Sequence, residues 1–111
     1  MLFFCGTFIV LVQCKKTTSP TSTSSSSGPG TNEVWIQGSA FNPTVINVSV
    51  NTTVKWTNKD GMAHTVTSTS GLFDSGSINS GGTYSHTFST AGTYPYKCTI
   101  HSNMNGTVNV Q

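Results

Sequence analysis

Apolar residues in the second part of the chain recur in short runs at every second position, as in Val54 and Trp56 or Val108 and Val110. This period of two is typical of β-strands that bury one face. Pairs such as Asp60-Gly61 and Asn105-Gly106 separate the runs and favour turns. The pattern predicts strands at residues 34–36, 45–50, 53–56, 64–66, 84–88, 93–98 and 107–110. The expected fold class is all-β, a Greek-key β-sandwich of about seven to eight strands.

The longest irregular stretch covers residues 70–82. Leu72, Phe73 and Ile78 are its large apolar residues, and we expect all three to point into the core.

The N-terminal part follows a different pattern. Residues 2–12 form an apolar run that is too short to span a bilayer core of about 30 Å as a helix, but it suits the hydrophobic region of a signal peptide. The run ends in Leu11-Val12-Gln13-Cys14, which resembles a bacterial lipoprotein signal whose cysteine becomes the acylated first residue. Residues 1–14 are therefore predicted to be a signal peptide that ends in a lipidation site at Cys14. An ordinary signal peptide cleaved nearby is the alternative.

Residues 15–32 are predicted to be a linker. Within them, residues 17–32 are nearly all Ser, Thr, Pro or Gly, which cannot bury enough apolar area to offset the entropy cost of ordering. The folded domain is then expected at residues 33–111.

Charge excludes one class of partner. Only 7% of the residues are charged, and the formal net charge is +2. Both excess charges belong to Lys15 and Lys16, so the domain itself sums to zero. A nucleic-acid binder needs clustered basic residues to replace counterions around phosphates, and the sequence has no such run.

Three side chains in one short segment carry metal-binding chemistry. The chain has three cysteines, at positions 5, 14 and 98, and only Cys98 lies in the predicted domain. Cys98, His101 and Met104 follow each other at intervals of three residues. A thiolate, an imidazole and a thioether suit a copper ion that alternates between Cu(I) and Cu(II). His64, where a turn enters a predicted strand, is the natural source of a second imidazole.

The segments around these residues identify a family resemblance. The sequences FNP at 41–43, VKWTN at 54–58, HTV at 64–66, FDSG at 73–76 and GTYPY at 92–96 are similar to those of cupredoxins, the small blue copper proteins. The resemblance covers residues 33–111 and is closest to the plastocyanin, pseudoazurin and amicyanin group. The two-residue gap between His101 and Met104 is most similar to that of amicyanins.

The resemblance implies a type 1 site for one copper ion. His64 and His101 would be the equatorial imidazoles, Cys98 the thiolate and Met104 the long axial ligand. Asn58 and Thr65 would stabilise the ligand loop and the site through hydrogen bonds. Zinc is the competing metal, but a thioether is a poor fourth ligand for a structural zinc site.

The function expected from this site is one-electron transfer between redox partners outside the cytoplasm. The partners implied by the resemblance are c-type cytochromes, oxidases or copper reductases. We expect a monomer in the periplasm, tethered to the membrane only through a lipid on Cys14. A copper-binding or delivery protein that uses the same ligands is the alternative. An enzyme is disfavoured because the chain has only three acidic residues and no second copper cluster.

Overall fold

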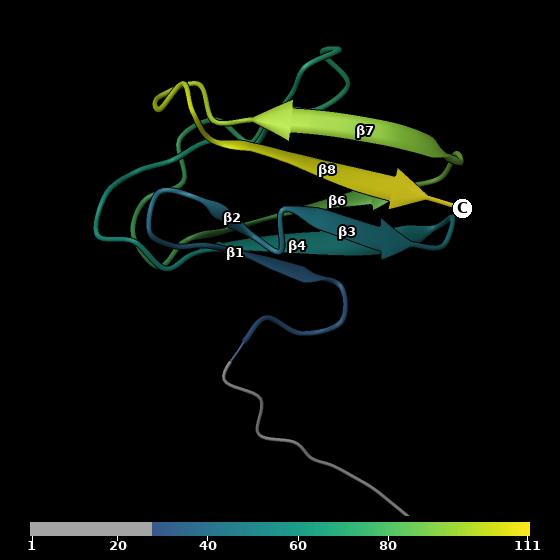
Figure 1. Ribbon diagram of the computed structural model, residues 1–111, viewed down its shortest axis with the longest axis horizontal. Coiled ribbons are helices and arrows are strands. Elements are labelled where there is room, and N and C mark those ends of the chain that lie inside the picture. The colour runs from purple at the N-terminus through teal and green to yellow at the C-terminus, as the bar shows by residue number, and fades with distance from the viewer. Residues whose placement is uncertain (1–27) are drawn as a thin grey trace, which may run out of the picture.

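The alternating segments form the expected strands in the computed structural model, which describes residues 28–111 (Figure 1). The predicted signal peptide, Cys14 and most of the predicted linker lie outside these residues. The strands are β1 (Glu33–Ile36), β2 (Phe41–Asn42), β3 (Val45–Val48), β4 (Thr52–Asn58), β5 (Thr67–Ser68), β6 (Thr83–Phe88), β7 (Gly92–Lys97) and β8 (Asn105–Val110).

The strands form two four-stranded sheets that face each other. One sheet has the order β2-β1-β4-β6 and the other the order β3-β8-β7-β5. Strands β1 and β4 are parallel, as are β3 and β8, and the other neighbours are antiparallel. The prediction of an all-β sandwich is confirmed.

The core lies between the sheets and follows the period of two. In β4, Val54, Trp56 and Asn58 are buried while the residues between them face outward. The indole of Trp56 contacts the ring of Tyr96 in β7 edge-on, with ring centroids 5.4 Å apart. This contact joins the centres of the two sheets, because β4 and β7 belong to different ones.

Two local expectations are wrong, and one short strand was missed. Residues 64–66 are not a strand: His64 forms only an isolated bridge with Ile78, and β5 begins at Thr67. Three consecutive residues, His64 to Val66, are buried there, which a strand with one solvent face does not allow. The short strand β2 was not predicted. Leu72 is 55% exposed, whereas Phe73 and Ile78 are buried as expected.

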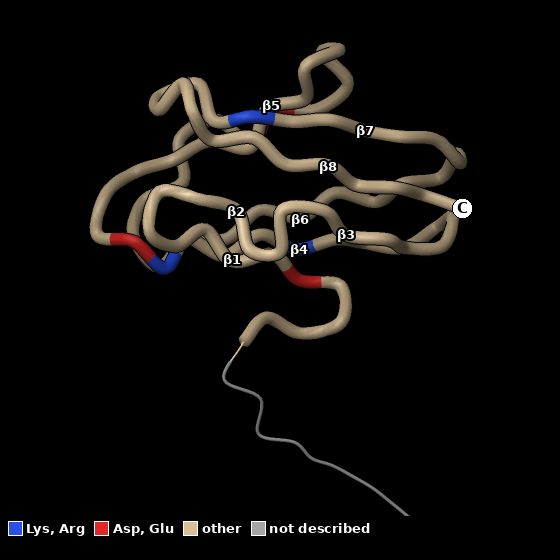
Figure 2. The backbone as a smooth tube through the Cα atoms, in the orientation of Figure 1, with Lys and Arg blue, Asp and Glu red and all other residues tan. Residues whose placement is uncertain are grey.

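Charged positions are few and scattered along the described chain, as Figure 2 shows. Among residues 28–111, no helix is long and apolar enough to cross a membrane.

Candidate metal centre

Two loops at one end of the sandwich bring the predicted ligands together. His64 lies in the connection from β4 to β5 and is fully buried. Its backbone exchanges two hydrogen bonds with Ile78, of 3.1 and 2.7 Å. These bonds fix the segment although it belongs to neither sheet.

The second loop joins β7 to β8 and begins with Cys98. Residues Lys97 and Asn105 are paired at the end of the antiparallel ladder. Within the loop, the amide of Cys98 donates to the carbonyl of Met104 at 3.0 Å, and the amide of Met104 donates to that of His101 at 3.2 Å. The hairpin therefore sets the spacing of Cys98, His101 and Met104.

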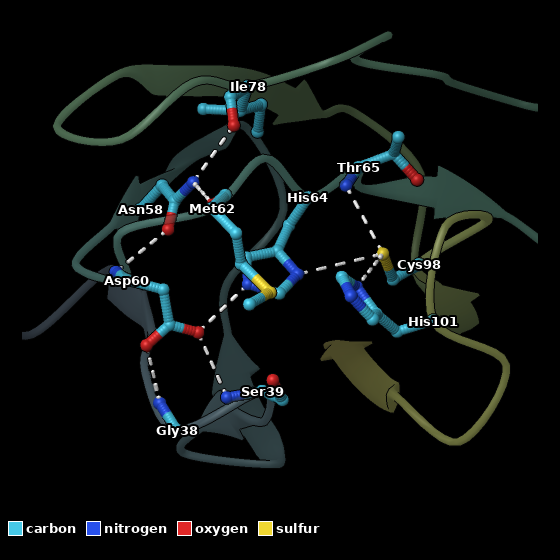
Figure 3. Close-up of polar contacts among 10 residues, drawn as sticks. All are labelled: Gly38, Ser39, Asn58, Asp60, Met62, His64, Thr65, Ile78, Cys98 and His101. Atoms are coloured by element: carbon cyan, nitrogen blue, oxygen red, sulfur yellow. Dashed lines mark hydrogen bonds and ion pairs between the residues drawn. The ribbon is translucent and has the colours of Figure 1, made fainter.

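The donor atoms of three predicted ligands converge. Sγ of Cys98 lies 3.9 Å from Nδ1 of His64 and 3.8 Å from Nδ1 of His101 (Figure 3). All three ligand atoms lie within 4.8 Å of one another. Bonds of about 2.0–2.1 Å to nitrogen and about 2.3 Å to sulfur, at roughly 120°, separate such nitrogen and sulfur atoms by about 3.8 Å. The donor set fits a single trigonal metal ion.

Hydrogen bonds prepare the thiol of Cys98 for metal binding. Burial raises the pKa of this thiol. Hydrogen bonds from the backbone amide of Thr65, from His101 and from the His64 side chain lower the pKa by more, so that it falls to about 6. The Thr65 amide donates to Sγ at 3.4 Å. A thiolate is the form that binds metal, so the site is predisposed toward a cation at neutral pH.

Thr65 also connects the two loops through its hydroxyl group. The amide of Thr99 donates to Oγ1 of Thr65 at 2.8 Å, and the two threonine hydroxyls lie 3.1 Å apart. The segment that follows His64 is therefore bonded directly to the residue that follows Cys98.

Asn58 fixes the turn that leads to His64. Its Nδ2 donates to the carbonyls of Met62 and Ile78, each at 2.8 Å, and its Oδ1 accepts from the amide of Asp60 at 2.9 Å. The side chain is fully buried, and these three bonds use both its donor and its acceptor groups.

Asp60 is a part of the site that the sequence analysis missed. Its Oδ2 lies 2.8 Å from Nε2 of His64, on the opposite side of the ring from Cys98. In the sequence, Asp60 precedes Gly61 in a turn before His64, and no role at the metal site was predicted for it. Its spacing of four residues from His64 is the one signal that could have indicated the contact.

The other predicted residues differ in exposure. Met104 is 2% exposed and belongs to the buried core cluster. His101 is partly exposed, in contrast to His64. His86 lies outside the donor cluster and packs against Phe73 and Phe88, and burial lowers its pKa.

Comparisons with known proteins point to a copper-binding family. The model of the family described as copper binding proteins of the plastocyanin/azurin family matches residues 30–111. Amicyanin of Paracoccus denitrificans is 37% identical over 71 residues, which cover 60% of this chain and 54% of that protein. The match thus spans about half the length of this curated relative.

Solved structures of an amicyanin and of another cupredoxin are also similar to this chain. The structure of an oxidized proline-to-alanine mutant of amicyanin matches with a TM-score of 0.69 and 32% identity, covering 78% of this chain and 86% of that one. A purple cupredoxin from Nitrosopumilus maritimus matches with a TM-score of 0.66 and 30% identity, covering 71% of this chain and 98% of that one.

Proposed function

The chain belongs to the plastocyanin/azurin family of copper-binding proteins, and from this membership we propose that it is a type 1 copper protein that carries single electrons between redox partners outside the cytoplasm. One observation carries the proposal: the Nδ1 atoms of His64 and His101 converge on the thiol of Cys98. In this proposal Met104, whose backbone closes the same loop, is the weak axial ligand.

The scaffold suits electron transfer because burial and hydrogen bonds hold the ligand side chains in place. A bound copper ion would supply the one-electron Cu(II)/Cu(I) couple. His64 is fully buried and hydrogen-bonded, and Cys98 is fixed by the end of β7 and by Thr65. Ligands that stay in place in both oxidation states require little reorganisation, so no bond needs to form or break when the electron moves.

His101 is the proposed point of electron entry and exit. It is the one partly exposed residue of the three-donor cluster in the described part of the chain. Ile100 and Met62, near His101 and His64 in the sequence, are 51% and 52% exposed. The domain has no net charge, so a partner such as a c-type cytochrome, an oxidase or a copper reductase would dock through short-range apolar and polar contacts with little electrostatic steering.

The proposed location follows from the N-terminal sequence. A signal peptide would export the chain to the periplasm, and a lipid on Cys14 would tether the domain through its Ser/Thr-rich linker. Tethering would raise the local concentration of the carrier near membrane-bound partners. Mass spectrometry of membrane fractions tests the lipid, and an unmodified soluble mature chain would contradict it.

The copper proposal is tested by colour. We expect the Cu(II)-loaded protein to show an intense visible band from charge transfer between the Cys98 thiolate and copper, and reduction to bleach it reversibly. Cys98→Ser and His64→Gln should abolish the band. The matched control His86→Gln should keep it, because His86 lies outside the donor cluster. A colourless Cu(II) complex, or a band that survives Cys98→Ser, would contradict the assignment.

Electron transfer and copper delivery are separated by kinetics. Cyclic voltammetry combined with competition by a Cu(I) chelator measures both cycling and loss of the ion. Fast reversible cycling with copper retained is expected for a carrier. Rapid release of Cu(I) from the reduced protein would instead indicate delivery.

A further inference from the structure

The carboxylate of Asp60 accepts three hydrogen bonds at the back of His64. Oδ1 accepts from the amide of Gly38 at 2.7 Å, and Oδ2 accepts from the amide of Ser39 at 2.9 Å. Oδ2 also lies 2.8 Å from Nε2 of His64 (Figure 3). The Asp60 side chain is 17% exposed and that of His64 is fully buried, so water is largely kept away from this contact.

The position of this carboxylate is fixed independently of His64. Gly38 and Ser39, in the connection from β1 to β2, have φ angles of 66° and 56°. Successive residues in this left-handed conformation can direct their amides toward one anion. The amide of Asp60 itself donates to Oδ1 of Asn58. The side chain and the backbone of Asp60 are thus both held by hydrogen bonds that do not involve His64.

The contact determines which nitrogen of His64 is free to bind a metal. A carboxylate accepts hydrogen bonds, so Nε2 of His64 carries the proton and donates it to Asp60. Nδ1 then keeps its lone pair, and this atom faces Sγ of Cys98 at 3.9 Å. A carboxylate on the remote nitrogen also makes the imidazole a stronger donor.

The charge of Asp60 is not neutralised by a lysine. Among residues 28–111, no lysine forms an ion pair with Asp60, and its contact with the neutral His64 ring is a hydrogen bond. The neighbouring Lys59 lies over the ring of Trp35, 4.5 Å from its centroid. A fixed negative charge behind a ligand favours the more highly charged state of a bound ion.

We propose that Asp60 is a positioning residue that orients the His64 ring through Nε2 and, by its negative charge, lowers the reduction potential of the metal centre. This inference rests on the proposed copper function. The residue acts through His64 and is not itself a ligand.

The matched variants are Asp60→Asn and Glu33→Gln. Asparagine keeps the shape and can still accept from Nε2, but it removes the charge. Glu33→Gln removes an equal charge from the opposite end of β1, where Glu33 bonds Thr57 and Lys55. Cyclic voltammetry on the copper-loaded full chain gives the potential of each variant, and the visible band shows whether the centre is intact.

For Asp60→Asn we expect the visible band to be retained and the ratio of Cu(II) to Cu(I) affinity to fall at least tenfold, which raises the potential by at least 59 mV for one electron. Glu33→Gln should change the potential much less. If the couple is reversible but Asp60→Asn shifts the reduction potential no more than Glu33→Gln does, the inference is overturned and the copper function still stands. A wild-type protein without any reversible couple would overturn both.

A measurement on the wild-type protein keeps the inference testable if Asp60→Asn does not fold. Nitrogen-15 NMR of the reduced protein assigns the tautomer of His64. We expect a proton on Nε2 that exchanges slowly with water. A proton on Nδ1, or an Nε2 proton that exchanges as fast as an exposed one, would overturn the positioning role.

Discussion

The backbone amide of Thr65 donates to Sγ of Cys98 across 3.4 Å, which joins two residues 33 positions apart in the sequence. The donor is the residue that follows His64, in the connection from β4 to β5. It places a donor next to the thiol without adding a charged side chain. The thiolate is therefore stabilised by the same segment that supplies the first imidazole.

The metal-free protein should become more stable as pH rises through the range in which Cys98 titrates. The pKa of its thiol is lowered to about 6 in the folded protein from an ordinary value of 9.0. The thiolate contribution is fully present above the unfolded pKa and is lost as pH falls through about 6. We expect the free energy of unfolding to gain on the order of 2 kcal/mol or more across this window. Urea unfolding between these limits measures it, and Cys98→Ser should remove this part of the slope.

Thr65→Val should destabilise the protein while leaving the hydrogen bond from the backbone amide of residue 65 to Sγ of Cys98 in place. Valine has a similar shape but loses the hydroxyl that accepts from the Thr99 amide at 2.8 Å. Losing this acceptor should cost about 1–2 kcal/mol in the free energy of unfolding, measured by denaturant unfolding. Thr65→Ser keeps the hydroxyl and serves as the control. Equal stability of the valine variant and the wild type would show that the hydroxyl does not hold the loops together.

Local patterns predict the ligand loop better than the surroundings of His64. One hairpin loop contains Cys98, His101 and Met104, so their short spacing in the sequence already indicates that they lie close together in space. The carboxylate of Asp60 depends on amides of Gly38 and Ser39, which are 22 and 21 positions away. No periodicity reports such a contact, because the fold alone brings the two turns together.

The errors in the strand prediction have a similar cause. The run from His64 to Val66 has strand-like composition, but its hydrogen bonds go to Ile78 and Ser75 rather than into a sheet. Leu72 is apolar yet exposed, whereas its neighbour Phe73 is buried and packs against Trp56. Composition gives the preference of a residue for burial, and the packing of its neighbours decides the outcome.

Gly106→Ala should be strongly destabilising. A Cβ at position 106 would clash with the Tyr96 ring, lying 2.5 Å from its hydroxyl oxygen and 2.9 Å from Cε2. Tyr96 is 1% exposed and contacts Trp56, so its ring cannot move aside easily. Overpacking of this kind costs about 1–3 kcal/mol or more in the free energy of unfolding. Gly61→Ala is the matched control, because nothing lies within 4 Å of a Cβ there. Similar thermal midpoints for the two variants would contradict the close contact.

Met104→Leu tests the proposed axial ligand separately from packing. Met104 is 2% exposed, and leucine nearly conserves its volume, so the loss of stability should stay below about 1.5 kcal/mol. If the thioether binds copper, its removal takes a donor from Cu(II) and should raise the reduction potential and shift the visible band. Met62→Leu is the control, since Met62 is 52% exposed and should leave both unchanged. Voltammetry and absorption of the two variants decide the question, and a Met104→Leu protein with the wild-type band and potential would exclude Met104 as a ligand.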